Sequence, residues 1–594
     1  MFPSKEQEKA LKIPGPVIVV AGPGAGKTHV LVARAIQEAK KGQREILVLT
    51  FTRRASGEVR ERIFQALGDG KNSITVTTFH SLGFRLVREW GKQIGVPVCP
   101  LLSPLQSYER LSWVAEQLGL GSFFPLGDVY RIIMLAKAKP EGAEELRREF
   151  PKLYPIYEGY QELLSRQKVM DFSDLIFYLI HFLSHPQIGP QLRSIYSFVL
   201  ADDFQDFDPA LWHALIRFAP NLFLTGSPAQ AIFSFRGATP SSLPTFLSLL
   251  PHAQHITFTL NYRSTPQIVR GAQELIKGLG YPEENLSSAK KDGPPIKVVL
   301  LADEIQESEF VAQTISAFLE HDIPPKDIAV LARTLSRLRV VEQALIRSNI
   351  PYILAGDVAL FKSPEVQDLL AYLKVAAGDH KALDRILNRP PRFSMLPIFL
   401  SRKNIPLTPQ HLFSLLPEME EGDEILKRET QTLREFLSFL QALERWGKEN
   451  PPAIEVLEWV ISKTQYESWV RKSDPLSYPR RLGNIRAFLD FVAQGGENLL
   501  EFLATLEVAQ EEGYVPVVTD RVTLATIHAA KGQAWKIVFV VGLEEGVLPH
   551  YLNPDLSEEL RLLYVAMTRA KELLYLVASG SPSRFLIKIE EVGK

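Results

Sequence analysis

Cysteine is the scarcest residue type in this 594-residue sequence, and Cys99 is the one example. A single cysteine excludes an internal disulfide framework and any Cys-x-x-Cys zinc site, and it fits a reducing compartment. No apolar run is long enough to span a bilayer, and no secretory signal peptide is visible at the N-terminus. We therefore expect a cytoplasmic protein with no zinc and no membrane partner.

The sequence also lacks an excess of charge of one sign, because its 67 Lys and Arg residues are balanced by 68 Asp and Glu residues. The net charge of −1 gives no global sign of a nucleic-acid partner, so any such surface must be a local patch. The composition is otherwise that of a globular protein, with 46% hydrophobic residues. The chain is too long for one hydrophobic core, and several domains are expected.

Apolar strands alternate with amphipathic helices over the first part of the chain, which predicts a parallel sheet with crossover helices. We expect its strands at Val17–Ala21, Ile46–Phe51, Ile74–Thr78, Phe198–Ala201, Leu222–Thr225 and Ile256–Leu260. Helices are expected to begin at Lys27, Arg54 and Ser81. Between the third and fourth strands the pattern is mostly helical, which indicates an insertion.

The same arrangement follows a second time. Strands are expected at Ile296–Leu301, Ile328–Ala332, Tyr352–Ala355, Arg521–Thr526, Ile537–Val541 and Leu573–Val577, with helices from Glu304 and Leu338. The fold class is therefore α/β, with two lobes that each carry a mainly helical insertion. We place the first lobe at 1–84 and 195–265 with its insertion at 85–194, and the second at 266–364 and 516–594 with its insertion at 365–515.

A glycine-rich loop joins the first strand to the first long helix, and it reads AGPGAGKT from Ala21. Strand, loop and helix in this order are the context of a phosphate-binding loop. Gly22, Gly24 and Gly26 let backbone N–H groups face a polyphosphate, Lys27 reaches its β and γ phosphates, and the Thr28 hydroxyl binds Mg²⁺. A plain glycine-rich turn would explain the glycines but not the Lys-Thr pair.

The second half of a nucleotide site is predicted where the strand at Phe198–Ala201 ends in Asp202 and Asp203. The first carboxylate is expected to hold Mg²⁺ and the second to orient the attacking water. Phosphoryl transfer also needs cations at the γ-phosphate, for which Arg263 and Arg569 are candidates. The alternatives are an exposed acidic turn and two solvated surface arginines.

These segments resemble the UvrD/Rep/PcrA-type superfamily 1 DNA helicases, in order, along almost the whole chain. The similar segments are SKEQ from Ser4, TFTRRA from Thr50, TFHS from Thr78, MDFSDL from Met170, DDFQD from Asp202, QAIFSFRGA from Gln230, NYRS from Asn261, TIHAAKG from Thr526 and YVAMTRA from Tyr564. Each alone is weak evidence, but nine in the correct order are very specific.

The resemblance implies an ATP-driven 3′-to-5′ translocase and helicase on single-stranded DNA and single-strand/duplex junctions, built from two RecA-like P-loop lobes. It implies that ATP and Mg²⁺ bind between the lobes. By resemblance, Gln7 contacts adenine, Tyr262 stacks on it and His29 lies beside it. Gln230 then joins Lys27, Arg263 and Arg569 at the γ-phosphate.

The resemblance also implies which residues line the DNA strand. The candidates are Phe51, Thr52, Thr78, His80, Phe233, Phe235, Arg236, Thr526 and His528. Aromatic faces stack on any base without reading its sequence, which suits a motor on arbitrary DNA. We favour stacking for Phe235, whereas Phe51, His80 and His528 are equally well explained as packed core residues.

Four departures from the family lie at or beside the expected ATP site. Asp203 replaces a glutamate, Ser227 replaces an aspartate and Ala534 replaces a glutamate, and His29 stands where many members have an arginine. We prefer an active translocase, because Lys27 and the two arginines are retained. The alternative is a hydrolysis-impaired, nucleotide-gated DNA-binding subunit with a repair or recombination protein as partner. A small P-loop enzyme such as a nucleotide kinase explains only the first fifth of the chain, and we expect no nuclease domain.

Overall fold

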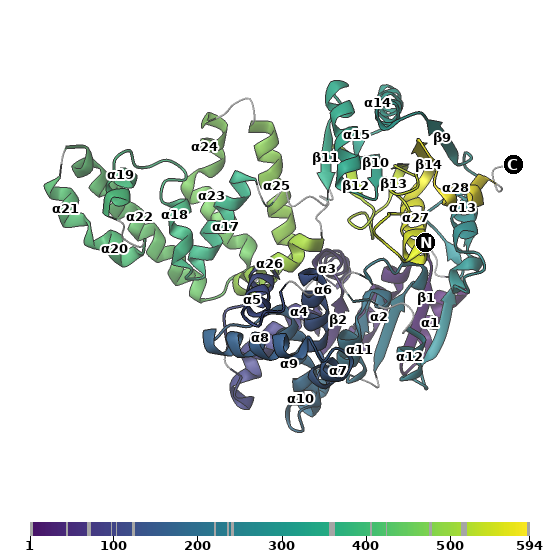
Figure 1. The fold of residues 1–594 in the computed structure, drawn as a ribbon, viewed down its shortest axis with the longest axis horizontal. Coiled ribbons are helices and arrows are strands. Elements are labelled where there is room, and N and C mark those ends of the chain that lie inside the picture. Colours follow the sequence, from purple (N-terminus) through teal and green to yellow (C-terminus); the bar gives the residue numbers. More distant parts are fainter. Residues whose placement is uncertain are drawn as a thin grey trace. The chain divides into compact units, whose positions relative to one another are not determined.

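The computed structural model contains two six-stranded parallel sheets and, in a separate unit, a group of packed helices (Figure 1). It describes residues 4–590, apart from 43–44, 68–72, 97, 103, 122–124, 219–220, 235–236, 239–242, 356–360, 362, 404–406, 423, 474–477 and 513–519. Contacts divide the chain into one compact unit, Met1–Asp357 with Glu512–Lys594, and a second, Val358–Glu511. The finer segment boundaries expected from the sequence remain a proposal.

The first sheet has the strand order β3-β2-β4-β5-β1-β6, and every neighbouring pair is parallel. Its strands are β1 (Val17–Ala21), β2 (Glu45–Thr50), β3 (Ile74–Thr78), β4 (Tyr196–Ala201), β5 (Leu222–Gly226) and β6 (Gln254–Phe258). The central strands are buried along their length, as both faces of a parallel sheet are covered by helices. Because all strands point the same way, the segments that follow them meet at one edge, where ligands bind in such sheets.

The helices of this first lobe are α1 (Lys5–Lys12), α2 (Lys27–Lys40), α3 (Arg53–Leu67), α4 (Phe79–Trp90), α11 (Pro209–Ile216) and α12 (Leu243–Ser248). Its helical insertion holds α5 (Pro104–Gln117), α6 (Leu126–Lys137), α7 (Gly142–Glu149), α8 (Tyr154–Gln167), α9 (Phe172–Ser184) and α10 (Ile188–Ile195). The insertion has a hydrophobic core of its own, in which Ile133, Ile156 and Tyr160 are fully buried.

The second lobe has the strand order β11-β12-β10-β13-β14-β9, again all parallel. Its strands are β9 (Lys297–Leu301), β10 (Ile328–Ala332), β11 (Tyr352–Ala355), β12 (Val522–Thr526), β13 (Trp535–Val541) and β14 (Ala570–Ser579). Its helices are α13 (Pro266–Ile276), α14 (Glu304–Glu320), α15 (Leu335–Arg347), α27 (Leu556–Met567) and α28 (Arg584–Glu590), and α13 packs against α27, α28 and β14. A small parallel pair, β7 (Leu260–Asn261) and β8 (Ser287–Ser288), lies outside both sheets.

The described residues of the second unit form mostly helices, with one isolated bridge between Pro452 and Asn498. Its helices are α17 (Pro364–Ala376), α18 (Leu383–Ile386), α19 (Leu396–Lys403), α20 (Pro409–Ser414), α21 (Leu416–Glu421), α22 (Glu424–Lys448), α23 (Ala453–Thr464), α24 (Tyr466–Ser473), α25 (Tyr478–Gly495) and α26 (Leu499–Glu512). Helix α17 is apolar on most of its surface and packs against α22, α23 and α25, which makes it the centre of this unit.

The α/β fold class with two parallel sheets is confirmed, and the differences are at element ends. The strand expected at Ile256–Leu260 is wrong in its bounds, because β6 ends at Phe258 and β7 is a separate strand. Helix α4 begins at Phe79 rather than Ser81, since the Thr78 hydroxyl accepts a hydrogen bond from the Ser81 N–H and caps it. Helix α15 begins three residues before the expected Leu338.

Candidate functional site

The expected phosphate loop connects β1 to α2 and is held from two sides. Gly24 and Gly26 have φ angles of 72° and 86°, a region that favours glycine. A Cβ on Gly24 would lie 2.5 Å from the Arg263 Cβ, and one on Gly26 would lie 2.6 Å from the Gln7 Nε2. Both positions therefore require glycine on conformational and steric grounds. Gly22 is covered by Leu286 in the same way.

Lys27 and Thr28, the first residues of α2, point to different parts of the loop. The Lys27 ammonium donates to the carbonyl oxygens of Ala21 and Gly22, at 2.9 and 3.3 Å. The Thr28 hydroxyl donates to the Asp202 carboxylate at 2.9 Å, across from the end of β4. The two halves of the site predicted from the sequence are thus brought together. His29 is exposed on the next position of the helix.

Asp202 is buried and Asp203 is half-buried at the end of β4. Burial and the neighbouring Asp203 carboxylate together raise the pKa of Asp202 to about 6, against the lowering effect of the Thr225 and Thr28 hydroxyls that donate to it. Asp203 has a φ of 57°. Residues other than glycine rarely adopt such an angle, although aspartate does so more readily than most. Its carboxylate accepts from the Gln205 amide at 3.0 Å.

Two arginines that come from different lobes lie close to each other. Arg263 follows β7, its Cβ borders Gly24 of the phosphate loop, and its guanidinium donates to the Thr568 carbonyl at 3.3 Å. Arg569 follows α27 and is 1% exposed, and within the described part of the chain it donates to uncharged oxygens of Val565, Gln533, Thr568 and Gln230. Burial lowers the pKa of Arg263 to about 10 and lowers that of Arg569 as well, where the charge of Arg263 adds to the effect.

Gln230 connects Arg569 to the first lobe. Its side-chain oxygen accepts from Arg569 at 3.2 Å, while its Nε2 is buried and has no hydrogen-bond partner among the described residues. A buried donor without a partner is costly, and such groups in native proteins are commonly explained by a ligand, an ion or a water molecule. Arg569, Arg263 and Gln230 together form a cluster of hydrogen-bond donors. In the described part of the chain, no carboxylate lies within ion-pair distance of either guanidinium.

The residues expected around the base are anchored to the same loop. Gln7 accepts from the Ser4 N–H in a capping box of α1, and its Nε2 donates to the Ala25 carbonyl at 3.1 Å. The Tyr262 N–H donates to the Gly24 carbonyl at 2.9 Å, and its side chain is half-buried. Their backbone and amide groups therefore position the loop itself.

Sequence reasoning missed Asn261 as a structural residue of the site. Its amide donates to the Pro23 carbonyl at 2.7 Å, and its side-chain oxygen accepts from the N–H groups of Arg263 and Ser264. Asn261 thereby holds Arg263 against the phosphate loop. The available signal was an asparagine two residues before the arginine, since asparagine side chains commonly bond the backbone two residues on.

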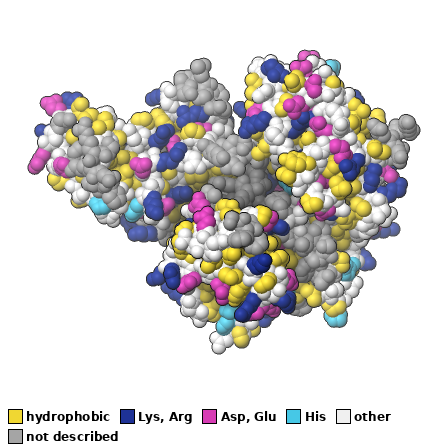
Figure 2. Space-filling view, in the orientation of Figure 1, with side chains coloured by type: hydrophobic (Ala, Val, Ile, Leu, Met, Phe, Trp, Pro, Cys, Tyr) yellow, Lys and Arg dark blue, Asp and Glu magenta, His cyan; other side chains and the backbone are white. Residues whose placement is uncertain are grey.

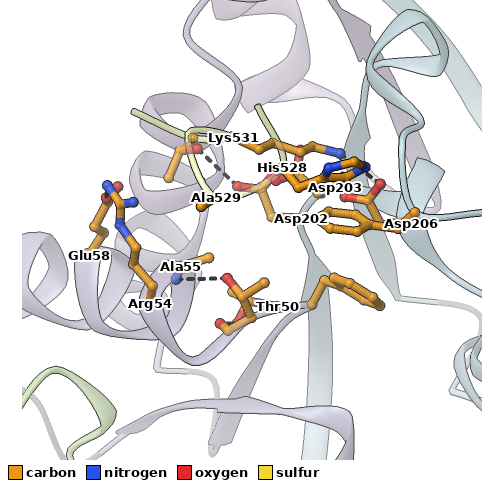
Figure 3. A pocket seen from close by; sticks show the side chains of 15 residues that line it. Thr50, Arg54, Ala55, Glu58, Asp202, Asp203, Asp206, His528, Ala529 and Lys531 are labelled. Carbon is orange, nitrogen blue, oxygen red and sulfur yellow. Dashed lines mark hydrogen bonds and ion pairs between the residues drawn. The ribbon is translucent and has the colours of Figure 1, made fainter. Parts of the chain in front are cut away.

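An ion pair between the lobes was also missed. The Lys531 ammonium, after β12, lies 2.6 Å from Asp206 of the first lobe and donates to the Gln230 carbonyl at 2.7 Å. Figure 3 shows Lys531 and His528 reaching toward Asp203 and Asp206 across the cavity that all four residues line. The cavity is lined by both lobes, with Thr28 and Asp202 on one side and Ala529 and Gly532 on the other.

Three of the expected DNA-contact side chains form one aromatic group at this cavity. The Phe51 and Phe233 rings lie 5.5 Å apart, and the His528 ring lies 6.1 Å from Phe233. Phe233 is 6% exposed, and the Lys531 ammonium is 5.0 Å from its ring centre. Phe235 and Arg236, which continue this segment, lie outside the described residues.

The remaining expected DNA-contact residues stand at the carboxyl ends of strands. The hydroxyls of Thr52, Thr78 and Thr526 each accept a hydrogen bond from the backbone N–H three residues further on. These bonds cap the helix or turn that follows each threonine. His80 is half-buried, with its ring 5.9 Å from Phe172. Their hydrogen bonds show why hydroxyl-bearing residues suit these turns, whatever else they contact.

The departures Ser227 and Ala534 have separate surroundings. Ser227 is fully buried, and its N–H donates to the Gln205 side chain at 2.7 Å. Ala534 is half-buried, immediately before β13. Neither side chain brings a carboxylate to the site.

No helix among the described residues is long and apolar enough to cross a membrane. Within the same residues, no group of three or more His, Cys, Asp or Glu side chains is arranged to hold a metal ion.

Comparison with known proteins agrees along the chain. The sequence model of the UvrD/REP helicase N-terminal domain matches residues 3–250, and that of the UvrD-like helicase C-terminal domain matches 256–396 and 404–581. The chain is 30% identical over 631 residues to the ATP-dependent DNA helicase PcrA of Staphylococcus aureus, which covers 99% of the chain and 86% of that protein. It is 28% identical over 639 residues to the PcrA of Staphylococcus epidermidis, with the same coverage.

Proposed function

Because this chain belongs to the UvrD/REP helicase family and is an ATP-dependent DNA helicase, we propose that it moves along single-stranded DNA in the 3′-to-5′ direction. Hydrolysis of ATP between the two lobes drives this movement and the opening of single-strand/duplex junctions. Its proposed place of action is the cytoplasm, and a repair or recombination protein is its proposed class of partner.

The observation that carries the proposal is a pair of buried arginines from two lobes, one of which Asn261 holds against the phosphate loop. Arg263 and Arg569 both have a lowered pKa, and neither has a carboxylate partner among the described residues. Buried cations without anionic partners are unfavourable, whereas a triphosphate would supply the missing negative charge. The unpartnered Nε2 of Gln230 is a further donor for it.

We assign the hydrolytic roles to the residues around Asp202. Lys27 binds the β and γ phosphates and exchanges its present bonds to loop carbonyls for phosphate oxygens. Thr28 and Asp202 fit Mg²⁺, because a hydroxyl and a carboxylate that already meet at 2.9 Å are the hard oxygen donors it prefers. Bound there, Mg²⁺ would neutralise charge on the phosphate oxygens.

Asp203 is the proposed residue that orients the attacking water. The water oxygen bonds to the γ-phosphorus, the bond to the bridging oxygen of ADP breaks, and the water proton passes toward the Asp203 carboxylate. Arg263, Arg569 and Gln230 stabilise the charge that develops on the transferred group. Because Arg569 comes from the second lobe, its contact depends on how closely the lobes approach.

The base and the DNA occupy separate proposed places. Gln7, His29 and Tyr262 surround adenine, next to the loop that Gln7 and Tyr262 already hold. The DNA strand runs past the ends of β2, β3 and β12. There its proposed contacts are Phe51, Thr52, Thr78, His80, Phe233, Phe235, Arg236, Thr526 and His528.

Stacking and local charge, rather than a strong overall charge, suit this DNA path. Lys and Arg side chains are interspersed with Asp and Glu on the face shown in Figure 2, in keeping with a net charge of −1. Base stacking contributes about 1–3 kcal/mol for each aromatic contact and does not depend on sequence.

Displacement of streptavidin from biotinylated oligonucleotides tests the direction of movement. We expect ATP-dependent displacement from a 5′-biotin and little from a 3′-biotin, with Lys27→Ala inactive on both. Displacement from the 3′ end alone would overturn the polarity. If ATP changes DNA affinity but drives no displacement from either end, the chain is the hydrolysis-impaired subunit instead.

A further inference from the structure

Helix α27 of the second lobe holds a short segment of the first lobe at two points. The segment is Gln230 to Ser234, called here the 230–234 segment. The Glu558 carboxylate accepts hydrogen bonds from both the N–H and the hydroxyl of Ser234, the former at 3.1 Å. One turn further along the helix, the Arg561 guanidinium donates to the Ala231 carbonyl at 2.7 Å.

Both holding side chains are buried and fixed by other partners. Glu558 is 6% exposed and Arg561 is 4% exposed. The second oxygen of Glu558 accepts from the Asn553 amide at 3.2 Å, and Arg561 lies 3.5 Å from the Asp555 carboxylate. Hydrogen bonds to charged groups in such surroundings are stronger than neutral ones, so the two contacts are specific rather than incidental.

The segment and the helix each touch the nucleotide site at one end. Gln230 begins the segment and accepts from Arg569, which follows the last turn of α27. Phe233, a proposed base-stacking residue, stands near the other end of the segment, beside the Ser234 that Glu558 holds. The 12-residue helix is about 18 Å long at 1.5 Å per residue, with Glu558 in its first turn and Arg569 just after its last.

Packing makes α27 a stiff connection. Leu562, Leu563 and Val565 of the helix and Ile232 of the segment are completely buried in one hydrophobic core. Packed interfaces move between discrete arrangements rather than deform continuously. A shift of α27 at Arg569 is therefore transmitted to Ser234 and Phe233.

We propose that Glu558 and Arg561 are positioning residues that couple nucleotide binding at Arg569 to DNA binding at the 230–234 segment. This inference rests on the proposed function, since it assigns a regulation to the same two sites. Neither residue touches ATP or DNA in it. Each acts by keeping the segment attached to the helix that carries Arg569.

The coupling factor is the quantity to measure. It is the ratio of the dissociation constants for labelled oligo-dT without and with a non-hydrolysable ATP analogue, obtained by fluorescence anisotropy. Coupling between two sites is typically 5- to 150-fold, roughly, and applies equally to both ligands. We expect Glu558→Ala to bring the ratio to within about twofold of one, with Glu558→Gln, which keeps an acceptor oxygen, retaining part of it.

Glu559→Gln is the matched control, because Glu559 is the next residue of the same helix and is fully buried. Its partners Arg333, His550 and Asn553 all belong to the second lobe. We expect this variant to lower stability and to leave the coupling factor unchanged. Ser234→Ala should lose part of the coupling, and combining it with Glu558→Ala should add no further loss.

These measurements distinguish a failure of this inference from a failure of the proposed function. A wild-type chain with no DNA-stimulated ATP hydrolysis would contradict the proposed function. A wild-type chain with stimulated hydrolysis whose coupling factor survives Glu558→Ala would overturn the inference alone. Equal losses in the Glu558 and Glu559 variants would overturn it too, and Ser234→Ala decides the matter if Glu558→Ala does not fold.

Discussion

Replacing Lys531 by methionine should weaken the association of the two lobes far more than an exposed Lys-Asp pair would suggest. Methionine keeps the apolar stem beside Phe233 but removes the ammonium that lies 2.6 Å from Asp206. The two side chains are only 10% and 2% exposed, so the buried Asp206 carboxylate would lose the ammonium that lies against it. Breaking a buried pair in this way costs about 3–5 kcal/mol.

The chain provides a matched control in the same lobe. Lys536 and Asp327 also lie 2.6 Å apart, but the lysine is 46% exposed. An exposed pair contributes about 0–1 kcal/mol, so Lys536→Met should change stability little. Urea unfolding followed by tryptophan fluorescence measures both variants, because Trp212 of the first lobe and Trp535 of the second are buried.

A second substitution tests the same argument, because the sign of its effect on stability is predicted. Adding Asp206→Asn to Lys531→Met should recover part of the lost stability, because it removes the buried negative charge that the Lys531 ammonium no longer faces. Equal losses of less than about 1 kcal/mol for the Lys531 and Lys536 variants would refute the burial argument. A further loss on adding Asp206→Asn would refute it as well.

Two more substitutions test other parts of the account. Asp203→Glu extends the carboxylate by one methylene and should raise ATP turnover at saturating DNA by about tenfold or more, since misplacement of such a group costs up to about 100-fold; unchanged or lower turnover would show that this distance does not limit the rate. In the second unit, burial raises the pKa of Glu429, but donation from the N–H groups of Met395, Ser394 and Leu396 outweighs it and leaves the pKa lowered. The stability Glu429 provides, about 1–3 kcal/mol, is therefore present above the unfolded-state pKa and is lost as pH falls through the folded one. Thermal unfolding of wild type and Glu429→Gln should differ at pH 6 and converge toward pH 3.5, and a difference that grows in acid would contradict the sign.

Local pattern was enough to predict the strands that frame the site. Val17–Ala21 and Ile328–Ala332 are unbroken apolar runs, and both form fully buried central strands with the expected bounds. The ends of these apolar runs also indicate which residues follow each strand. The meeting of Thr28 with Asp202 therefore follows from two strands of one parallel sheet.

Contacts between distant segments could not be read from pattern. Lys531 and Asp206 are 325 residues apart, and Glu558 and Ser234 are 324 apart. Each appears in the sequence as one more charged or polar residue on a helix or turn. Only the folded lobes show that Asn261 holds the phosphate loop or that Phe233 is covered, because these depend on neighbours the sequence does not name.

Steady-state ATP hydrolysis with and without single-stranded DNA, using Lys27→Ala as the blank, tests the central claim most directly. The account predicts turnover that rises strongly with DNA in the wild type and is lost in the variant. Tight DNA binding that shifts with ATP, together with no turnover above the blank, would contradict it and would assign the lost chemistry to Asp203, Ser227 and Ala534.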